Sequence, residues 1–149
     1  MIISSSFKPA WWLTNSHMQT IYSSLARKKK APIDFSERLE LPDGDFLDLA
    51  WANGGLDSDT PLVIFLHGLG GCVDSSYVSG QIEAYNRRGW RAVFMHFRGA
   101  SSEPNRHARA YHSGDTADLN YLLHVLNERS PNTKKALVGV SLGGNVLLK

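Results

Sequence analysis

The chain has 149 residues, enough for one domain with a sizeable core; 42% of them are hydrophobic and 20% are charged. Sixteen Lys and Arg residues against fourteen Asp and Glu residues leave a net charge of +2, too weak a bias to indicate nucleic-acid binding. The single cysteine, Cys72, excludes an internal disulfide, and no apolar run is long enough to span a bilayer. Residues 1–13 also lack the continuous apolar core of a signal peptide, so we expect a cytoplasmic protein.

Residues 1–36 differ in character from the rest and are predicted to form an N-terminal arm. Asn15 or Ser16 can cap a short helix, and positive charge from Arg27 to Lys30 would suit its C-terminal end. The apolar residues of this helix recur at i, i+3, i+4, i+7 and i+8, namely Met18, Ile21, Tyr22, Leu25 and Ala26. Such a stripe favours a helix packed on the rest of the domain.

The alternative for the arm is peripheral contact with a membrane surface. Phe7, Trp11 and Trp12 lie near the lysines in sequence, and aromatic and basic residues together are typical of interfacial helices. One short stripe does not decide between the two.

From residue 37 onward the pattern is that of a single domain, residues 37–149. Residues 38–41 and 46–51 are predicted strands around an Asp-Gly turn, and residues 53–60 form a polar loop. Residues 62–66 are apolar at every position, as expected of a parallel strand covered on both faces, and residues 91–97 are predicted to be another buried strand. Helices are predicted over residues 76–88, ended by Gly89, and over residues 114–129, capped by Ser113.

The last strand covers residues 136–140 and leads into the start of another helix. The whole order is an antiparallel hairpin followed by strand, helix, strand, helix, strand and helix. Alternation of this kind indicates the α/β class, a mostly parallel sheet with helices on both faces.

The strongest chemical signal is Gly139-Val-Ser141-Leu-Gly143. The motif alone is weak, but an apolar strand precedes it and a helical pattern follows it directly. This is the setting of a nucleophile elbow, in which a serine sits at a strained strand-to-helix turn. Ser141 is therefore the predicted nucleophile, and the Leu142 amide at the helix start is a predicted oxyanion donor. The structural alternative is a glycine-rich turn whose serine merely caps the helix.

A second glycine-rich segment, His67-Gly-Leu-Gly-Gly71, follows the buried strand at residues 62–66. In this architecture the loop at that place supplies the other oxyanion donor, for which we predict the Leu69 amide. Neither nucleotide-binding pattern is present: G-x-G-x-x-G would need glycine where Val73 stands, and G-x-x-x-x-G-K-[ST] does not occur. A serine beside two such donors indicates acyl transfer to water.

Several of these segments together resemble the YheT-like esterase family of the α/β-hydrolase superfamily. The resemblance rests on His67-Gly-Leu-Gly-Gly71, Met95-His-Phe-Arg-Gly99, Glu103-Pro-Asn-Arg106, Tyr111-His-Ser-Gly114 and Gly139-Val-Ser-Leu-Gly-Gly-Asn145. It extends to Ser5-Ser-Phe-Lys-Pro9, His17-Met-Gln-Thr20 and Leu39-Glu-Leu-Pro-Asp-Gly-Asp45, and so covers nearly the whole chain.

The resemblance implies an α/β-hydrolase fold and a carboxylic-ester hydrolase with a Ser-Asp-His triad and no cofactor or metal. Carried over by position, Ser141 is the nucleophile. The triad acid and histidine follow the serine in chain order, so we expect them beyond Lys149 and expect these 149 residues alone to be inactive. The expected partner is a small-molecule or lipid ester.

Other groups of the chain have simpler interpretations. His67 is expected to be structural and His96 to bond to a loop, while Asp115 and Asp118 suit a helix start. The arginines at positions 98, 106 and 109, with Glu103, are expected to fix a long loop through ion pairs. Two other functions stay open: a non-catalytic binding module with the same fold, and a thioesterase or acyltransferase with the same nucleophile.

Overall fold

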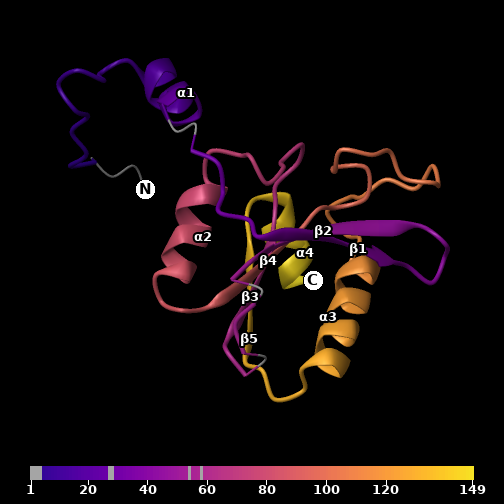
Figure 1. The fold of residues 1–149 in the computed structure, drawn as a ribbon. Helices are drawn as coiled ribbons and strands as arrows, with labels where there is room; N and C mark the ends of the chain where they lie inside the picture. Colours follow the sequence, from indigo (N-terminus) through magenta and orange to yellow (C-terminus); the bar gives the residue numbers. More distant parts are fainter. Residues whose placement is uncertain (1–4, 27–28, 54, 58) are drawn as a thin grey trace.

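The computed structural model describes residues 5–26, 29–53, 55–57 and 59–149. Its helices and strands follow one another as shown in Figure 1: α1 (Ser16–Ala26), β1 (Phe35–Glu40), β2 (Phe46–Ala52), β3 (Leu62–Leu66), α2 (Val78–Asn86), β4 (Arg91–Met95), α3 (Ala117–Arg129), β5 (Lys135–Gly139) and α4 (Leu142–Leu148). Arg27 and Lys28, expected at the end of the first helix, lie outside the described residues, as do residues 54 and 58 of the predicted polar loop.

The five strands form one mixed sheet in the order β1-β2-β4-β3-β5. β1 and β2 are the predicted antiparallel hairpin, in which Gly44 takes a φ of +84° in the Asp-Gly turn. β2 also pairs antiparallel with β4, whereas β3 pairs parallel with both β4 and β5. The predicted order of elements and the parallel core of the sheet are therefore confirmed.

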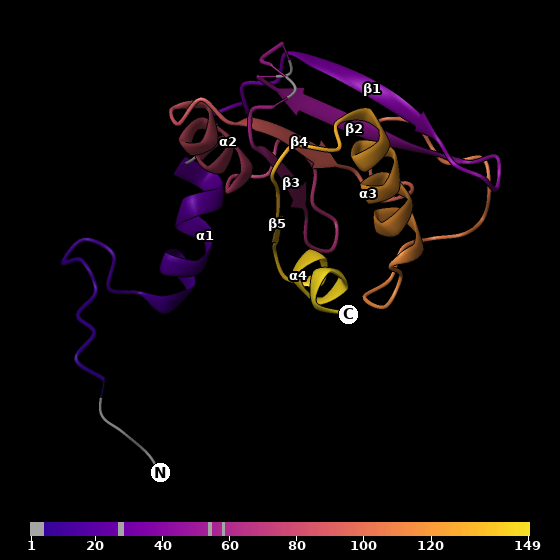
Figure 2. The same ribbon diagram turned by 90° about the horizontal axis from the view of Figure 1, so that it is seen from below.

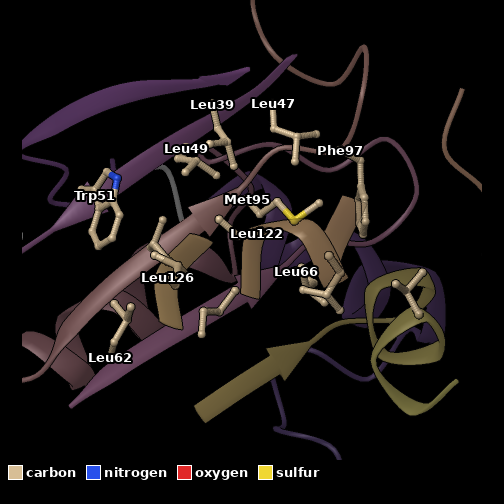
Figure 3. Packing of buried hydrophobic residues seen from close by; sticks show 14 of the residues in the cluster. Leu39, Leu47, Leu49, Trp51, Leu62, Leu66, Met95, Phe97, Leu122 and Leu126 are labelled. Atoms are coloured by element: carbon tan, nitrogen blue, oxygen red, sulfur yellow. The ribbon is translucent and has the colours of Figure 1, made fainter. Parts of the chain in front are cut away.

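Helices cover both faces of this sheet. On one face α2 packs Val78 and Ile82 against Phe65 and Phe94. On the other face α3 and α4 pack against alternate residues of the same strands, and Figure 3 shows Leu122 and Leu126 beside the strand residues of this cluster. All five residues of β3 and of β4 are buried, which explains why both strands are apolar at nearly every position.

One predicted helix boundary needs correction, the start of α3. α3 begins at Ala117, and its capping position is Thr116 rather than Ser113. The carbonyl of Ser113 instead accepts a hydrogen bond from Asn145 Nδ2 on α4, at 2.9 Å. The stop at Gly89 is as predicted, because Gly89 takes a φ of +67° just after α2.

The arm carries an exposed helix. Asn15 caps α1 as predicted, since its Oδ1 accepts hydrogen bonds from the amides of His17 and Met18 at 2.9 and 3.2 Å. The expected packing of the apolar stripe on the domain is wrong, because Met18, Ile21, Tyr22 and Leu25 are each 42–59% exposed. Figure 2 shows the arm running away from the sheet. No helix within the described ranges is long and apolar enough to cross a membrane.

Candidate active site

Ser141 lies at a sharp turn between β5 and α4. Its backbone has φ 51° and ψ −114°, a left-handed conformation that costs a non-glycine residue about 1–3 kcal/mol. The side chain makes no capping hydrogen bond to α4, and the residue is exposed. A serine that only capped the helix would make the capping hydrogen bond and would not need a strained backbone. The geometry therefore favours the nucleophile elbow.

The close approach of strand and helix at this turn requires glycine on both sides of Ser141. A Cβ on Gly143 would lie 2.6 Å from the carbonyl oxygens of Leu66 and His67, and one on Gly139 would lie 2.5 Å from the Gly143 oxygen. Both distances are far inside van der Waals contact. The two glycines of the motif therefore let α4 pack directly against the end of β3.

The glycine loop after β3, residues 67–71, lies beside Ser141. A Cβ placed on Gly68 would be 3.3 Å from Ser141 Cβ and 4.0 Å from its Oγ. Since β3 and β5 are parallel neighbours, their carboxyl ends bring the loop and the serine to the same edge of the sheet. Open α/β sheets bind their ligands at such an edge.

Two backbone amides at this edge have no hydrogen-bond partner. Within the described residues, nothing accepts from the Leu69 amide in the glycine loop or from the Leu142 amide at the first turn of α4. The neighbouring amides of Gly68, Gly70 and Gly71 are all bonded. The Leu69 side chain is 78% exposed, so the amide beside it belongs to an open part of the loop.

His67 begins the glycine loop but is locked into the core. The residue is fully buried, its Nε2 accepts from the Phe97 amide at 3.1 Å, and its Nδ1 lies 2.7 Å from the Gly68 oxygen. This arrangement requires a proton on Nδ1 alone. Burial lowers the pKa of His67 and keeps the ring neutral. The expected structural role is confirmed.

The other histidines of the domain are also engaged away from Ser141. The Ser141 hydroxyl has no hydrogen-bond partner among the described residues. His96 was expected to bond to a loop, but its Nδ1 and its amide both bond to the Asp48 carbonyl in β2. The remaining rings have partners of their own: His107 with the Asp43 oxygen, His112 with the Gly114 amide and His124 with Glu128.

The long loop after β4 is fixed by ion pairs, as predicted. Arg98 is buried and binds both carboxylate oxygens of Asp118 on α3, at 2.7 and 2.8 Å, and Asp45 of the hairpin turn, at 3.1 Å. Arg109 binds Asp115 at 2.6 Å. Asp115 and Asp118 are thus partners of this loop and not only helix-start acids. No group of three or more potential metal ligands occurs in the described part of the chain.

Two tyrosines at the site carried no predicted role. Tyr77 and Tyr111 place their hydroxyls on the amides of Gly68 and Gly70. Tyr111 belongs to one of the motifs on which the family resemblance rests. Its hydroxyl bonds to Gly70, which is 41 residues away in sequence, and neither periodicity nor spacing indicates such a contact. Only the folded arrangement identifies it.

A mixed sheet covered by helices on both faces, with a strained serine turn at its carboxyl edge, is the architecture of the α/β hydrolases. Comparison with known proteins agrees. The family described as alpha/beta hydrolase fold matches residues 61–149. The chain is 45% identical over 145 residues to the "Putative esterase YheT" of Escherichia coli, a match covering 97% of this chain and 43% of that protein.

More distant relatives extend the comparison. Mouse phospholipase ABHD3 is 27% identical over 154 residues, covering 99% of this chain and 37% of that protein. The structure of Est1E from Butyrivibrio proteoclasticus with bound ferulic acid shares the fold, with a TM-score of 0.64 at 16% identity over 75% of this chain and 45% of that one. The chain spans about two fifths of the length of these curated relatives. It belongs to the α/β-hydrolase family.

Proposed function

We propose that the protein is a serine hydrolase that cleaves carboxylic esters through an acyl-enzyme on Ser141. The observation that carries the proposal is the exposed serine, held at φ 51° beside a glycine loop. A second observation supports it, the two unpartnered amides of Leu69 and Leu142 at the same edge of the sheet. Strain at an exposed polar residue serves no purpose in packing.

In the proposed reaction the Ser141 oxygen attacks the ester carbonyl carbon and its proton passes to a base. The carbonyl oxygen becomes an oxyanion that accepts hydrogen bonds from the Leu69 and Leu142 amides. Collapse of this intermediate breaks the bond to the alcohol, which leaves with the proton. Water then attacks the acyl group, the Ser141 oxygen recovers a proton, and the acid is released.

The base and its orienting acid are proposed to come from sequence that follows Lys149 in a longer protein. The described histidines of the domain are all bonded elsewhere, and Ser141 has no partner among the described residues. In α/β hydrolases the acid and histidine follow the serine in chain order. This chain alone is therefore expected to show little or no turnover.

The test uses p-nitrophenyl acetate and butyrate with this chain and with a version extended at its C-terminus to the length of the curated relatives. We expect turnover only by the extended protein, and a fall of about 10⁴-fold or more with Ser141→Ala. Turnover that survives Ser141→Ala contradicts the proposal. Parallel assays with thioesters and with added alcohols identify a thioesterase or an acyltransferase.

A non-catalytic binding module is the alternative from another class. It predicts an extended protein that neither turns over esters nor reacts with a fluorophosphonate probe. The strained, uncapped Ser141 argues against it, because a scaffold without chemistry gains nothing from that conformation.

We further propose that the arm contacts an anionic lipid surface, which would bring the site to lipid esters. Residues 1–33 carry five basic residues and no acidic residue, while the rest of the chain has eleven basic and fourteen acidic residues. Trp11 is 89% exposed and Trp12 53%, and such aromatic rings favour the bilayer interface. Each basic residue near an anionic surface adds about 1 kcal/mol of binding.

Vesicle sedimentation tests the arm. We expect the chain to pellet with vesicles containing phosphatidylglycerol and much less with pure phosphatidylcholine, and Trp11→Ala with Trp12→Ala to weaken binding. Trp90→Ala, at a tryptophan of the domain that is 36% exposed and lies outside the arm, is the matched control and should leave vesicle binding unchanged. Equal recovery with both vesicle types contradicts the preference for an anionic surface, and recovery with neither contradicts lipid contact.

A further inference from the structure

The four consecutive backbone amides of residues 68–71 in the glycine loop differ in whether they donate a hydrogen bond. The Gly68 amide donates to Tyr77 Oη at 3.4 Å, the Gly70 amide to Tyr111 Oη at 3.0 Å, and the Gly71 amide to the Gly68 oxygen at 3.0 Å. Among these described residues only Leu69 keeps a free amide. A flexible glycine loop does not by itself produce such a pattern, since any of its amides could turn outward.

Tyr111 is held rigidly while it makes its bond. Its ring stacks on Phe97, with centroids 5.0 Å apart and planes 12° apart, and meets the edge of the buried His67 ring at 5.9 Å. Phe97 and His67 are themselves joined through the Phe97 amide and His67 Nε2. The Tyr111 ring therefore packs on the residues that follow β3 and β4. Its hydroxyl reaches the glycine loop from the segment that precedes α3.

Tyr77 supports the loop from the opposite side. It directly precedes α2, and its ring stacks on Phe65 of β3 with centroids 6.2 Å apart. A Cβ on Gly71 would lie 2.7 Å from Tyr77 Oη, so the loop packs closely over this hydroxyl. The loop is thus bonded at Gly68 and Gly70 by two anchored side chains, one on each side of Leu69.

We propose that Tyr77 and Tyr111 are positioning residues that hold the glycine loop so that, of the amides in this loop, only that of Leu69 points at the oxyanion. This inference rests on the proposed serine-hydrolase function. A donor that is fixed before the reaction stabilises developing charge without reorganising, and this is the source of its catalytic value. Removing a hydroxyl acceptor frees the neighbouring glycine amide and lets the loop sample other orientations.

The experiment compares Tyr111→Phe and Tyr77→Phe in the extended, active protein. Each change keeps the ring and its stacking but removes the acceptor. Tyr85→Phe is the matched control, because among the described residues its hydroxyl bonds only to Gln81 within α2, at 2.7 Å. We expect kcat on p-nitrophenyl acetate to fall about five- to tenfold for Tyr111→Phe and about two- to threefold for Tyr77→Phe, whose bond is longer. KM should stay within about twofold, and Tyr85→Phe should match the parent.

Two further measurements separate positioning from general damage. Affinity for an aryl boronate, which mimics the tetrahedral intermediate, should fall in parallel with kcat while the melting temperature stays within a few degrees. Hydrogen exchange at the Gly70 amide should become faster in Tyr111→Phe only. Unchanged kcat in Tyr111→Phe, or equal changes in KM and kcat with no change in boronate affinity, overturns the inference. Ser141→Ala in the same assay reports separately whether the proposed function itself fails.

Discussion

Two loops at the same edge of the sheet are held by different kinds of interaction, one by neutral hydrogen bonds and the other by ion pairs. The glycine loop after β3 is held by neutral hydrogen bonds to Tyr77 and Tyr111. The long loop after β4 is held by ions, with Arg98 buried between carboxylates of the hairpin turn and α3. The two are connected, because Tyr111 lies at the end of the charged loop. The ion-paired loop therefore positions one of the two tyrosines that hold the glycine loop.

The largest effect is expected when the buried ion pairs of the loop after β4 are removed. Arg98→Met removes the cation from Asp45 and Asp118, both of which are almost fully buried. Two buried carboxylates that lose their shared buried cation should cost about 3–5 kcal/mol of the free energy of unfolding. Urea denaturation followed by circular dichroism measures this, and a loss below about 1 kcal/mol would show that the pairs are not essential to the scaffold.

The corresponding change near the glycine loop is Gly143→Ala in α4, because Gly143 packs against the backbone where this loop begins. The added methyl group must displace backbone atoms, since its Cβ would lie 2.6 Å from two carbonyl oxygens. We expect a loss of about 2–3 kcal/mol, measured by the same denaturation experiment. Gly80→Ala is the control, because nothing lies within 4 Å of a Cβ there. A Gly143→Ala protein as stable as the control would refute the tight strand–helix contact.

The two loops should also respond to acid in different pH ranges. Burial alone would raise the pKa of Asp45, but hydrogen bonds from the Arg106 and Phe46 amides, Asn105 and Arg98 outweigh it and lower the pKa from 3.8 to about 2. The carboxylate therefore stabilises the fold above about pH 4, and its contribution of roughly 2 kcal/mol is lost as the pH falls towards 2.

His67 titrates in the other range. Its lowered pKa means that the unfolded chain takes up a proton first as the pH falls below 6.5, so stability decreases there. Denaturant midpoints measured from pH 7.5 to 2.5 should therefore fall in two stages. Asp45→Asn should flatten only the lower stage. A single stage that Asp45→Asn leaves unchanged would contradict this assignment.

The smallest effect is expected at the rim of the charged loop. Arg106 binds Glu40, but the two side chains are 46% and 59% exposed. Water and salt screen solvent-exposed ion pairs, so Arg106→Met should leave the urea midpoint almost unchanged, and any small loss should disappear in high salt. A larger loss, comparable to that of Arg98→Met, would show that the loop depends on its surface as much as on its buried ions.

The sequence predicted those features that local pattern determines. β3 and β4 were recognisable because burial on both faces leaves an apolar run, and the hairpin because its turn needs the Asp-Gly pair. The turn at Ser141 was predictable because tight strand–helix packing requires glycine at positions 139 and 143.

The rest depends on contacts between distant segments. A tyrosine looks the same in sequence whether its hydroxyl meets water or the Gly70 amide, so Tyr77 and Tyr111 were not predicted as site residues. The helix α3 starts after Thr116 rather than Ser113, and the Ser113 carbonyl accepts a hydrogen bond from Asn145, 32 residues away, which no local pattern indicates. Periodicity found the stripe of α1 but could not identify what the stripe meets.

The closeness of Gly68 to Ser141 has a practical consequence. Gly68 does not occupy a positive φ, so alanine is conformationally permitted there, and its methyl group would stand about as close to Ser141 as the geometry allows, 3.3 Å from the serine Cβ. The contact with the serine Cβ would be tighter than ordinary van der Waals packing, so the glycine loop or the serine turn must shift slightly to accept the methyl group. Alanine at position 68 would therefore change the placement of the loop relative to Ser141 without altering the serine itself.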